Sequence, residues 1–326
     1  MYPASTPNPT PPSDGVLDLR CPLLPQTLME AVALLANPDD IEADAVTTMV
    51  ERDPMLMAQL QKTVNSAYYG LSRTITSPAR AVMLLGPVTV VGLVAGMSFT
   101  RLRPEGAPQV VAAADRVVRH SLATAYLAQF LVEHVDPADR PAQSGEAYTA
   151  GLLHDLGKFV LLHNFPAAAV LYGGPGADPA EAGADLAERE RALLGFSHTE
   201  AGAVAAERSN FPEALVRVVR LHHDAGALGD EADRAVAFLL RATAAASRGA
   251  TALGYPAGTA VPAAAPALAG PAGADDADAE DGDAVWAAVA TQDLPHIGGP
   301  DAVAALVQGE GDRLRQYVDA LMAPAA

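Results

Sequence analysis

The sequence predicts an all-α fold, and two observations support that prediction. Half of the residues are apolar but only 5% are aromatic, and much of the apolar content is alanine, the residue with the highest intrinsic helix propensity. No stretch shows sustained alternation of apolar and polar residues with β-branched enrichment, so no convincing strand is indicated. The 326 residues are enough for one or two domains with a substantial core.

The charge and the cysteine content exclude several classes of protein. A net charge of −18 argues against a nucleic-acid-binding surface, because phosphate binding depends on clustered Lys and Arg. Cys21 is the sole cysteine, which excludes an internal disulfide and a cysteine-rich zinc site. The first fifteen residues lack the basic and apolar regions of a signal peptide. We therefore expect a cytoplasmic protein with neither a nucleic acid nor a membrane as partner.

Helix start signals are clear along the first part of the chain. Asp53-Pro54 and Ser77-Pro78 each combine a good N-cap with proline at the first helical position, and Asp178-Pro179 repeats the pattern. The helix that starts near Pro54 is predicted to end at Asn65-Ser66. Asn65 is expected to cap this helix end while Tyr68 and Tyr69 pack between lobes, although a partner-binding loop is the alternative.

The uncharged segment from Ala81 to Phe99 is long enough to span a bilayer. Gly86-Pro87 interrupts it, however, and this pair is typical of one helix ending and another beginning. Two short buried helices are therefore the preferred interpretation.

The distribution of Pro, Gly and Asp divides the chain into five segments. The last of them contains a predicted amphipathic helix between Asp301 and Met322, which is expected to dock on the rest of the protein. The segments are a disordered start (1–19), a helical lobe (20–106), a helical core (107–250), a flexible acidic linker (251–284) and a C-terminal helical segment (285–326).

Every histidine except His296 lies in the core segment, and several are expected on or beside different helices. Imidazole and carboxylate groups that converge from several helices can bind a divalent metal, and such a metal could activate water against a phosphoryl group. Lys158 would add a point charge suited to phosphate. The candidate metal ligands are His120, His154, Asp155, His198, His222 and His223.

Each of these histidines also has an ordinary structural explanation. A single histidine at a helix end is usually a hydrogen-bonded or capping residue, and His-His pairs occur at helix C-termini because of the dipole. We assign His134, His163 and His296 to this structural class. The adjacent His154-Asp155 followed by Gly157-Lys158 is harder to explain by coincidence.

These motifs together resemble the HDOD family, a relative of the HD-domain phosphohydrolases. The resemblance covers about residues 20 to 250, and its most specific element is the run from Val64 to Gly70. It implies an N-terminal helical lobe packed on an HD-like helical core. It also implies a bacterial signalling role as a protein-interaction module for signalling proteins. Further matching motifs are Arg119–Ser121, Gly151–Gly157, Phe196–His198 and Phe211–His223.

The candidate ligands and Lys158 resemble positions used by the related HD-GYP cyclic-dinucleotide phosphodiesterases, but one position departs from the pattern. HD enzymes close their site with an aspartate on a later helix, and the matching stretch 238–247 contains no acid. Thr243 occupies the expected place, and Arg241 is predicted to lie close to the site, where a guanidinium would oppose a divalent cation. The Gly254-Tyr255-Pro256 sequence comes too late after His223 to be the motif of that family's name.

Three functions follow from this pattern, in order of preference. The first is a signalling adaptor with a degenerate HD site that is non-catalytic or retains metal binding. The second is a metal-dependent phosphohydrolase of the cyclic-dinucleotide phosphodiesterase type, which would use Fe, Mn, Zn or Mg and direct phosphate with Lys158. The third is a sensor that binds a nucleotide or cyclic dinucleotide without hydrolysing it.

Overall fold

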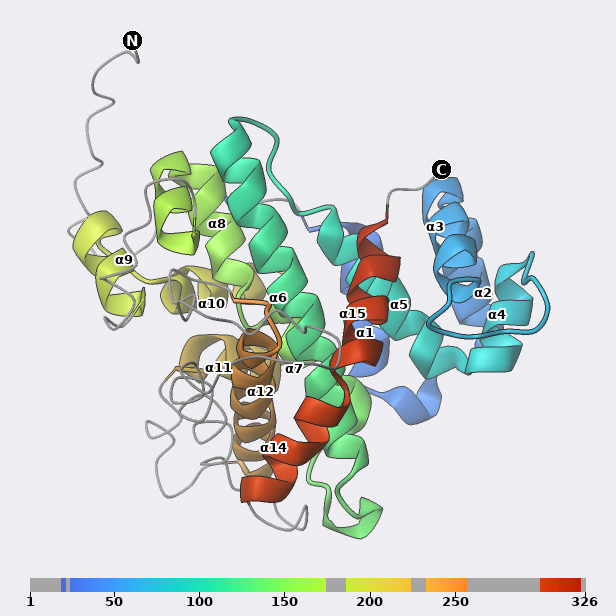
Figure 1. Ribbon diagram of the computed structural model, residues 1–326. Helices are drawn as coiled ribbons and strands as arrows, with labels where there is room; N and C mark the ends of the chain where they lie inside the picture. The colour runs from blue at the N-terminus through green and yellow to red at the C-terminus, as the bar shows by residue number, and fades with distance from the viewer. Residues whose placement is uncertain (1–18, 22–23, 174–185, 224–232, 257–299, 324–326) are drawn as a thin grey trace, which may run out of the picture.

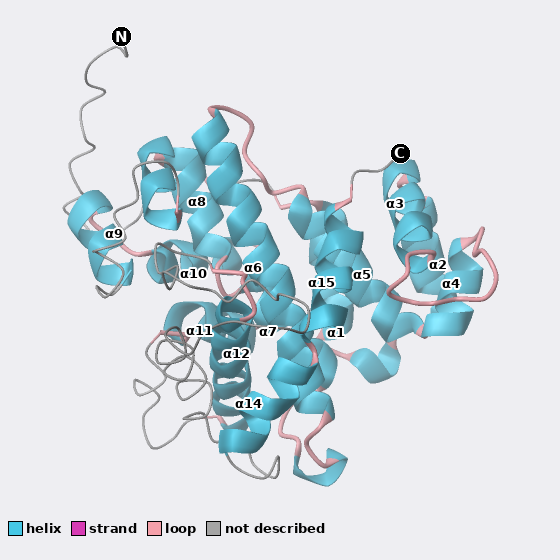
Figure 2. Ribbon diagram, viewed as in Figure 1, coloured by secondary structure: helices cyan, strands magenta, loops and turns pink. Residues whose placement is uncertain are grey.

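A computed structural model describes residues 19–21, 24–173, 186–223, 233–256 and 300–323. Within these ranges the secondary structure is entirely helical (Figure 2), which confirms the all-α prediction. The predicted disordered start, the acidic linker after residue 256 and Asp178-Pro179 lie outside the described residues.

Helices begin at Pro54, Pro78 and Pro87, as the start signals predicted. The side chain of Asp53 accepts hydrogen bonds from the backbone of Met55 and Leu56, and that of Ser77 accepts one from Arg80. The first helices of the described chain are α1 (Gln26–Leu35), α2 (Ala43–Glu51), α3 (Pro54–Val64), α4 (Pro78–Leu85) and α5 (Pro87–Thr100), with the short 3₁₀ helix η1 (Pro38–Asp40) after α1.

The apolar segment from Ala81 to Phe99 forms parts of two helices, as predicted. Gly86 separates α4 from α5 and has a φ of 84°, in the left-handed region that suits glycine. Most of α5 is buried inside the protein, so its apolar character reflects packing. Among the described helices, none is both long enough and apolar enough to cross a membrane.

The central helices are arranged around α6 (Pro108–Glu133), which crosses the middle of the molecule (Figure 1) and packs against α7 and α12. The remaining helices of this group carry most of the candidate ligands. They are α7 (Ser144–Leu153), α8 (Leu156–Asn164), α9 (Leu186–Leu194), α10 (His198–Arg208), α11 (Glu213–Leu221) and α12 (Arg234–Ala252), with 3₁₀ helices η2 (Pro137–Asp139) and η3 (Pro166–Tyr172).

The C-terminal region docks on the rest of the protein, but it forms two helices where one was predicted. These are α14 (Pro300–Gly309) and α15 (Gly311–Met322). The glycines that flank Glu310 have low helix propensity, and the two helices meet different neighbours. Helix α14 packs on α12 and α6, whereas α15 packs on α3, α5 and α6. In Figure 1, α15 accordingly lies between α6 and the first helices.

The segment after α3 has the structural role expected of it. The side-chain amide of Asn65 donates to the carbonyl of Ile75 at 2.8 Å and accepts from its N–H at 2.7 Å, which fixes the loop. The ring of Tyr68 packs edge-on against Tyr69 and Tyr317, with centroids 4.7 and 5.6 Å away. Both Tyr68 and Tyr69 line a cavity of about 400 Å³ between α5, α6 and α15.

Candidate metal centre

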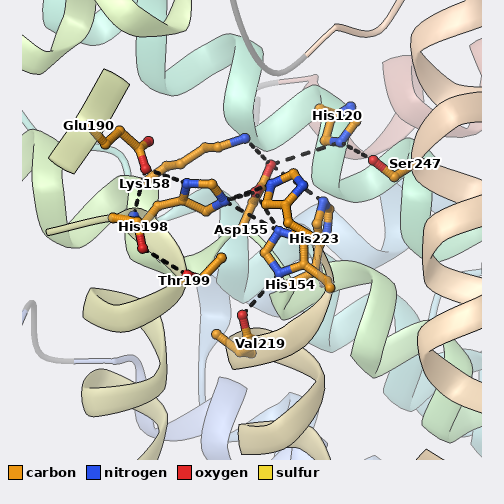
Figure 3. A network of polar contacts seen from close by, with 12 residues as sticks. His120, His154, Asp155, Lys158, Glu190, His198, Thr199, Val219, His223 and Ser247 are labelled. Carbon is orange, nitrogen blue, oxygen red and sulfur yellow. Dashed lines mark hydrogen bonds and ion pairs between the residues drawn. The ribbon is translucent and has the colours of Figure 1, made fainter. Parts of the chain in front are cut away.

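The structure brings the seven predicted site residues into one cluster (Figure 3), although they come from five separate helices or helix ends. His154 ends α7, Asp155 precedes α8, and Lys158 lies in the first turn of α8. His198 is the first residue of α10. His120 lies in the middle of α6. His222 and His223 follow α11 directly.

A close crossing of α8 and α10 places Asp155 and Lys158 beside His198. The crossing depends on Gly157, because a Cβ there would lie 2.6 Å from the backbone nitrogen of Gly202 and nearer still to the carbonyl oxygen of His198. Any other side chain at position 157 would therefore push the two helices apart. The glycine of the His-Asp-Leu-Gly-Lys run is thus required by packing.

Asp155 is at the centre of the cluster, and its two oxygens face different groups. Oδ2 lies 2.7 Å from Nζ of Lys158 and 3.4 Å from Nε2 of His154. Oδ1 lies 3.5 Å from Nε2 of His198 and 3.7 Å from Nε2 of His222. Oδ1 is buried and has no hydrogen-bond partner among the described residues. A buried carboxylate oxygen in that state calls for a cation or a proton donor.

The side chains of His154, His198 and His222 are buried, and each ring directs its Nε2 atom toward Asp155. Nδ1 of His154 and of His222 bonds to the carbonyls of Gly151 and Val219, at 2.7 and 2.9 Å. Because a carbonyl only accepts, Nδ1 must carry the proton in each ring. Nδ1 of His198 bonds to a carboxylate at 2.6 Å, with the same consequence. A ring that carries its proton on Nδ1 presents a bare Nε2 lone pair when it is neutral, the state in which histidine binds a metal.

These lone pairs lie unusually close to one another. Nε2 of His198 is 3.3 Å from Nε2 of His222 and 3.1 Å from Nε2 of His223. Two bare lone pairs at that distance repel unless a proton or a metal ion lies between them. Ligands bound tetrahedrally at about 2.0–2.2 Å from one ion are separated by about 3.3–3.6 Å. The nitrogen separations, and those to Oδ1 of Asp155, are close to that spacing.

Burial and neighbouring charges keep the cluster in the protonation state that a metal needs. Burial lowers the pKa of His120 to about 4 and lowers that of His154 well below its usual range. Burial opposes ionisation of Asp155, but its interactions with His154 and with the ammonium of Lys158 outweigh it and hold the pKa of Asp155 well below normal. Neutral imidazoles and an ionised carboxylate need lose no proton before they bind a cation.

Sequence reasoning missed a second buried carboxylate, that of Glu190 on α9. Its Oε2 is the acceptor for Nδ1 of His198 and also accepts from the His198 backbone N–H at 2.7 Å. Its Oε1 accepts from the hydroxyl of Tyr172 at 2.8 Å. Burial raises the pKa of Glu190, but His198 outweighs that effect and lowers it. Glu190 lies in a charge-rich helix among exposed acids and bases, so no sequence signal distinguishes it.

The helix that would carry the final aspartate of HD enzymes, α12, contacts the cluster through a hydroxyl group. Nε2 of His120 bonds to the hydroxyl of Ser247 at 3.1 Å, and its Nδ1 bonds to the carbonyl of Tyr255 at 2.6 Å. Thr243, one turn before Ser247, is fully buried and its hydroxyl has no partner in the described part of the chain. Arg241, which was predicted to lie close to the site, is exposed on α12.

The histidines that we assigned a structural role lie outside the cluster where the structure describes them. Nδ1 of His134 and of His163 bonds to the carbonyl four residues earlier, at 2.8 and 3.0 Å. His296 is outside the described residues. Tyr255, in the Gly-Tyr-Pro sequence, reaches His120 only through its backbone carbonyl.

The chain is similar to a known domain family and to a protein of known sequence. A model of the HDOD domain matches residues 21–225, more than half of the chain. An uncharacterised protein of Treponema pallidum is 26% identical over 207 residues, which are 62% of this chain but only 37% of that protein.

Three solved structures resemble the chain over most of its length. An HDOD domain protein of unknown function from Geobacter sulfurreducens has a TM-score of 0.64 and 20% identity, with 93% of this chain and 94% of that one covered. A candidate phosphohydrolase from Shewanella amazonensis SB2B has a TM-score of 0.61 and 21% identity, with 92% and 94% covered. A candidate signal transduction protein from Marinobacter aquaeolei VT8 has a TM-score of 0.63 and 25% identity, with 94% and 62% covered.

Proposed function

We propose that this chain, which belongs to the HDOD domain family, is a signalling protein that holds a divalent metal ion in its HD-like centre and does not hydrolyse phosphate esters. The observation that carries the metal is the unpartnered Oδ1 of Asp155, which faces the Nε2 atoms of His198 and His222. His223 adds a third nitrogen. When bound, the ion would supply a positive charge that attracts the lone pairs of these oxygen and nitrogen atoms.

The ligand set favours some metals over others. Three imidazoles and one carboxylate suit Zn, Fe or Mn, whereas Mg prefers oxygen ligands and retained water. Four protein ligands also fill a tetrahedral zinc site, as in structural centres, while catalytic zinc sites keep a position for water. The set therefore favours an ion that ties α8, α10 and α11 together.

Two further observations support the absence of hydrolysis. The described part of α12 has no acid between Phe238 and Ser247, so the centre lacks the second carboxylate that HD enzymes use. His120, His154, Asp155 and Lys158 are each no more than 3% exposed. A phosphate ester would have to reach them past His223, the exposed member of the cluster. The helical surface is then the part available to partner signalling proteins.

Elemental analysis of protein purified without chelator tests the metal. We expect about one metal ion per chain in the wild type and a loss of it in His222→Ala. His163→Ala is the matched control, because this histidine bonds only to a carbonyl of its own helix. A folded wild-type protein that contains no metal and takes up none of Zn, Mn or Fe would refute the proposal.

The exposure of His223 favours one alternative, a metal-dependent phosphohydrolase, because solvent reaches the centre on that side. The alternative predicts turnover of a cyclic dinucleotide that His154→Ala abolishes. Cyclic-dinucleotide binding without turnover, measured by calorimetry, would instead identify a sensor. We expect neither turnover nor binding, and turnover by the wild type would overturn the non-catalytic part of the proposal.

A further inference from the structure

The ammonium group of Lys158 lies inside the cluster, where few lysines are found. Its side chain is 3% exposed, and Nζ is 2.7 Å from Oδ2 of Asp155. The ring of Tyr172 lies beside it, with its centroid 5.8 Å from Nζ. Lys158 and Asp155 are three residues apart at the start of α8, so one turn of helix fixes their pairing.

The side of Asp155 that faces Lys158 carries a second set of metal-binding groups. Nε2 of His154 is 3.4 Å from Oδ2, and Nε2 of His120 is 3.8 Å from it. Ligand atoms of His120, His154 and Asp155 all lie within 4.8 Å of one another. This set is distinct from the group formed by His198, His222 and His223, and Asp155 stands between the two.

We propose that Lys158 takes the place of a second metal ion: its ammonium neutralises the Oδ2 side of Asp155 and keeps the centre mononuclear. This inference rests on the proposed metal binding by the other side of the same carboxylate. An ion held by Oδ2, His154 and His120 would share its carboxylate oxygen with the ammonium. Two cations at such close range repel strongly in a buried site.

The charges of the surrounding residues also favour a single metal ion. Among the residues that the structure describes, Asp155 is the single carboxylate directed between both histidine groups, and Glu190 is occupied by His198 and Tyr172. Thr243 contributes no charge from α12. One carboxylate can be balanced by one ammonium and one divalent ion far better than by an ammonium and two divalent ions. Removal of the ammonium should therefore open the second site without any new ligand.

Metal stoichiometry of the full chain tests this directly. Protein stripped with chelator is titrated with Mn²⁺, and the bound metal is counted by elemental analysis and examined by electron paramagnetic resonance. We expect one Mn²⁺ per chain in the wild type and two in Lys158→Met, with spin coupling between the two ions. Lys158→Arg keeps the charge and should bind one. His120→Ala should leave the wild type at one and return Lys158→Met from two to one.

The outcomes separate this inference from the proposed function. A wild type that binds no Mn²⁺ or other divalent metal refutes the proposed function and the inference with it. A wild type that binds two ions, or a folded Lys158→Met that binds one, refutes the role of Lys158 and leaves the metal centre intact. If Lys158→Met does not fold, Lys158→Gln replaces it, since its amide can still bond to Asp155 but carries no charge.

Discussion

Replacing Gly157 with alanine should separate α8 from α10 and dismantle the candidate metal centre. The added Cβ would lie 2.6 Å from the backbone nitrogen of Gly202, whereas ordinary contacts begin at 3.4 Å. The helices must therefore move apart by at least about 0.8 Å, because the obstructing atoms belong to the backbone and cannot rotate away. Overpacking of this kind costs about 3 kcal/mol or more.

The same displacement has a consequence for metal binding. His198 moves with α10 and Asp155 with α8, so the distance between Nε2 and Oδ1 should increase from its present 3.5 Å. That distance already lies at the upper end of the separation of about 3.3–3.6 Å that one tetrahedral ion spans between its ligands. We therefore expect a loss of metal as well as of stability.

Denaturant unfolding of the metal-free proteins measures the first effect, and elemental analysis of the refilled proteins measures the second. Gly309→Ala is the control, since a Cβ there meets nothing within 4 Å and should be neutral or stabilising. If Gly157→Ala unfolds within about 0.5 kcal/mol of the wild type and retains its metal, the argument from close helix crossing is wrong.

Three other perturbations have defined outcomes. Glu190→Gln should weaken Mn²⁺ affinity about 10- to 100-fold, measured by competition with a chelating dye; unchanged affinity would show that the carboxylate does not support His198. Tyr148→Phe removes a buried 2.7 Å bond to the hydroxyl of Tyr317, and should destabilise the protein by about 1–3 kcal/mol in denaturant unfolding; a change below about 0.5 kcal/mol would contradict this. In metal-free protein, the pKa of His120 lies at about 4, below its ordinary 6.5, so between these values the unfolded chain binds a proton that the folded chain does not. Stability should therefore fall as the pH drops from 6.5 to 4, with His120 contributing about 1.4 kcal/mol per pH unit; an equal slope in a folded His120→Gln protein would rule out this origin.

Much of the fold and of the candidate site could be predicted because the signals are local. A capping residue followed by proline, as in Asp53-Pro54, needs no tertiary contact to start a helix, and the structure places α3 there. Residues of a composite site can also be named individually from sequence. The prediction that these residues converge depended on the resemblance of the whole set of motifs rather than on any one position.

What could not be predicted depends on which face of a helix a residue occupies. Arg241 and Thr243 are two positions apart, yet one is exposed and the other fully buried, because two residues span more than half a helical turn. Glu190 has exposed charged neighbours in sequence and a buried partner in space. The pairing of Lys158 with Asp155 is local in sequence. Its proposed role depends on His120 and His154, which come from other helices and lie beside the same carboxylate oxygen.

The docking of α15 on α3 limits how early the protein can complete its folding during synthesis. Gln59 and Thr63 of α3 donate to the carbonyls of Leu321 and Ala320, at 3.1 and 3.2 Å. A ribosome makes α3 early and α15 after every other described helix. Until α15 has left the exit tunnel, the buried face of α3 lacks its partner, and such long-range closure slows folding. For most of its synthesis the nascent chain therefore lacks the helix that accepts the hydrogen bonds of Gln59 and Thr63.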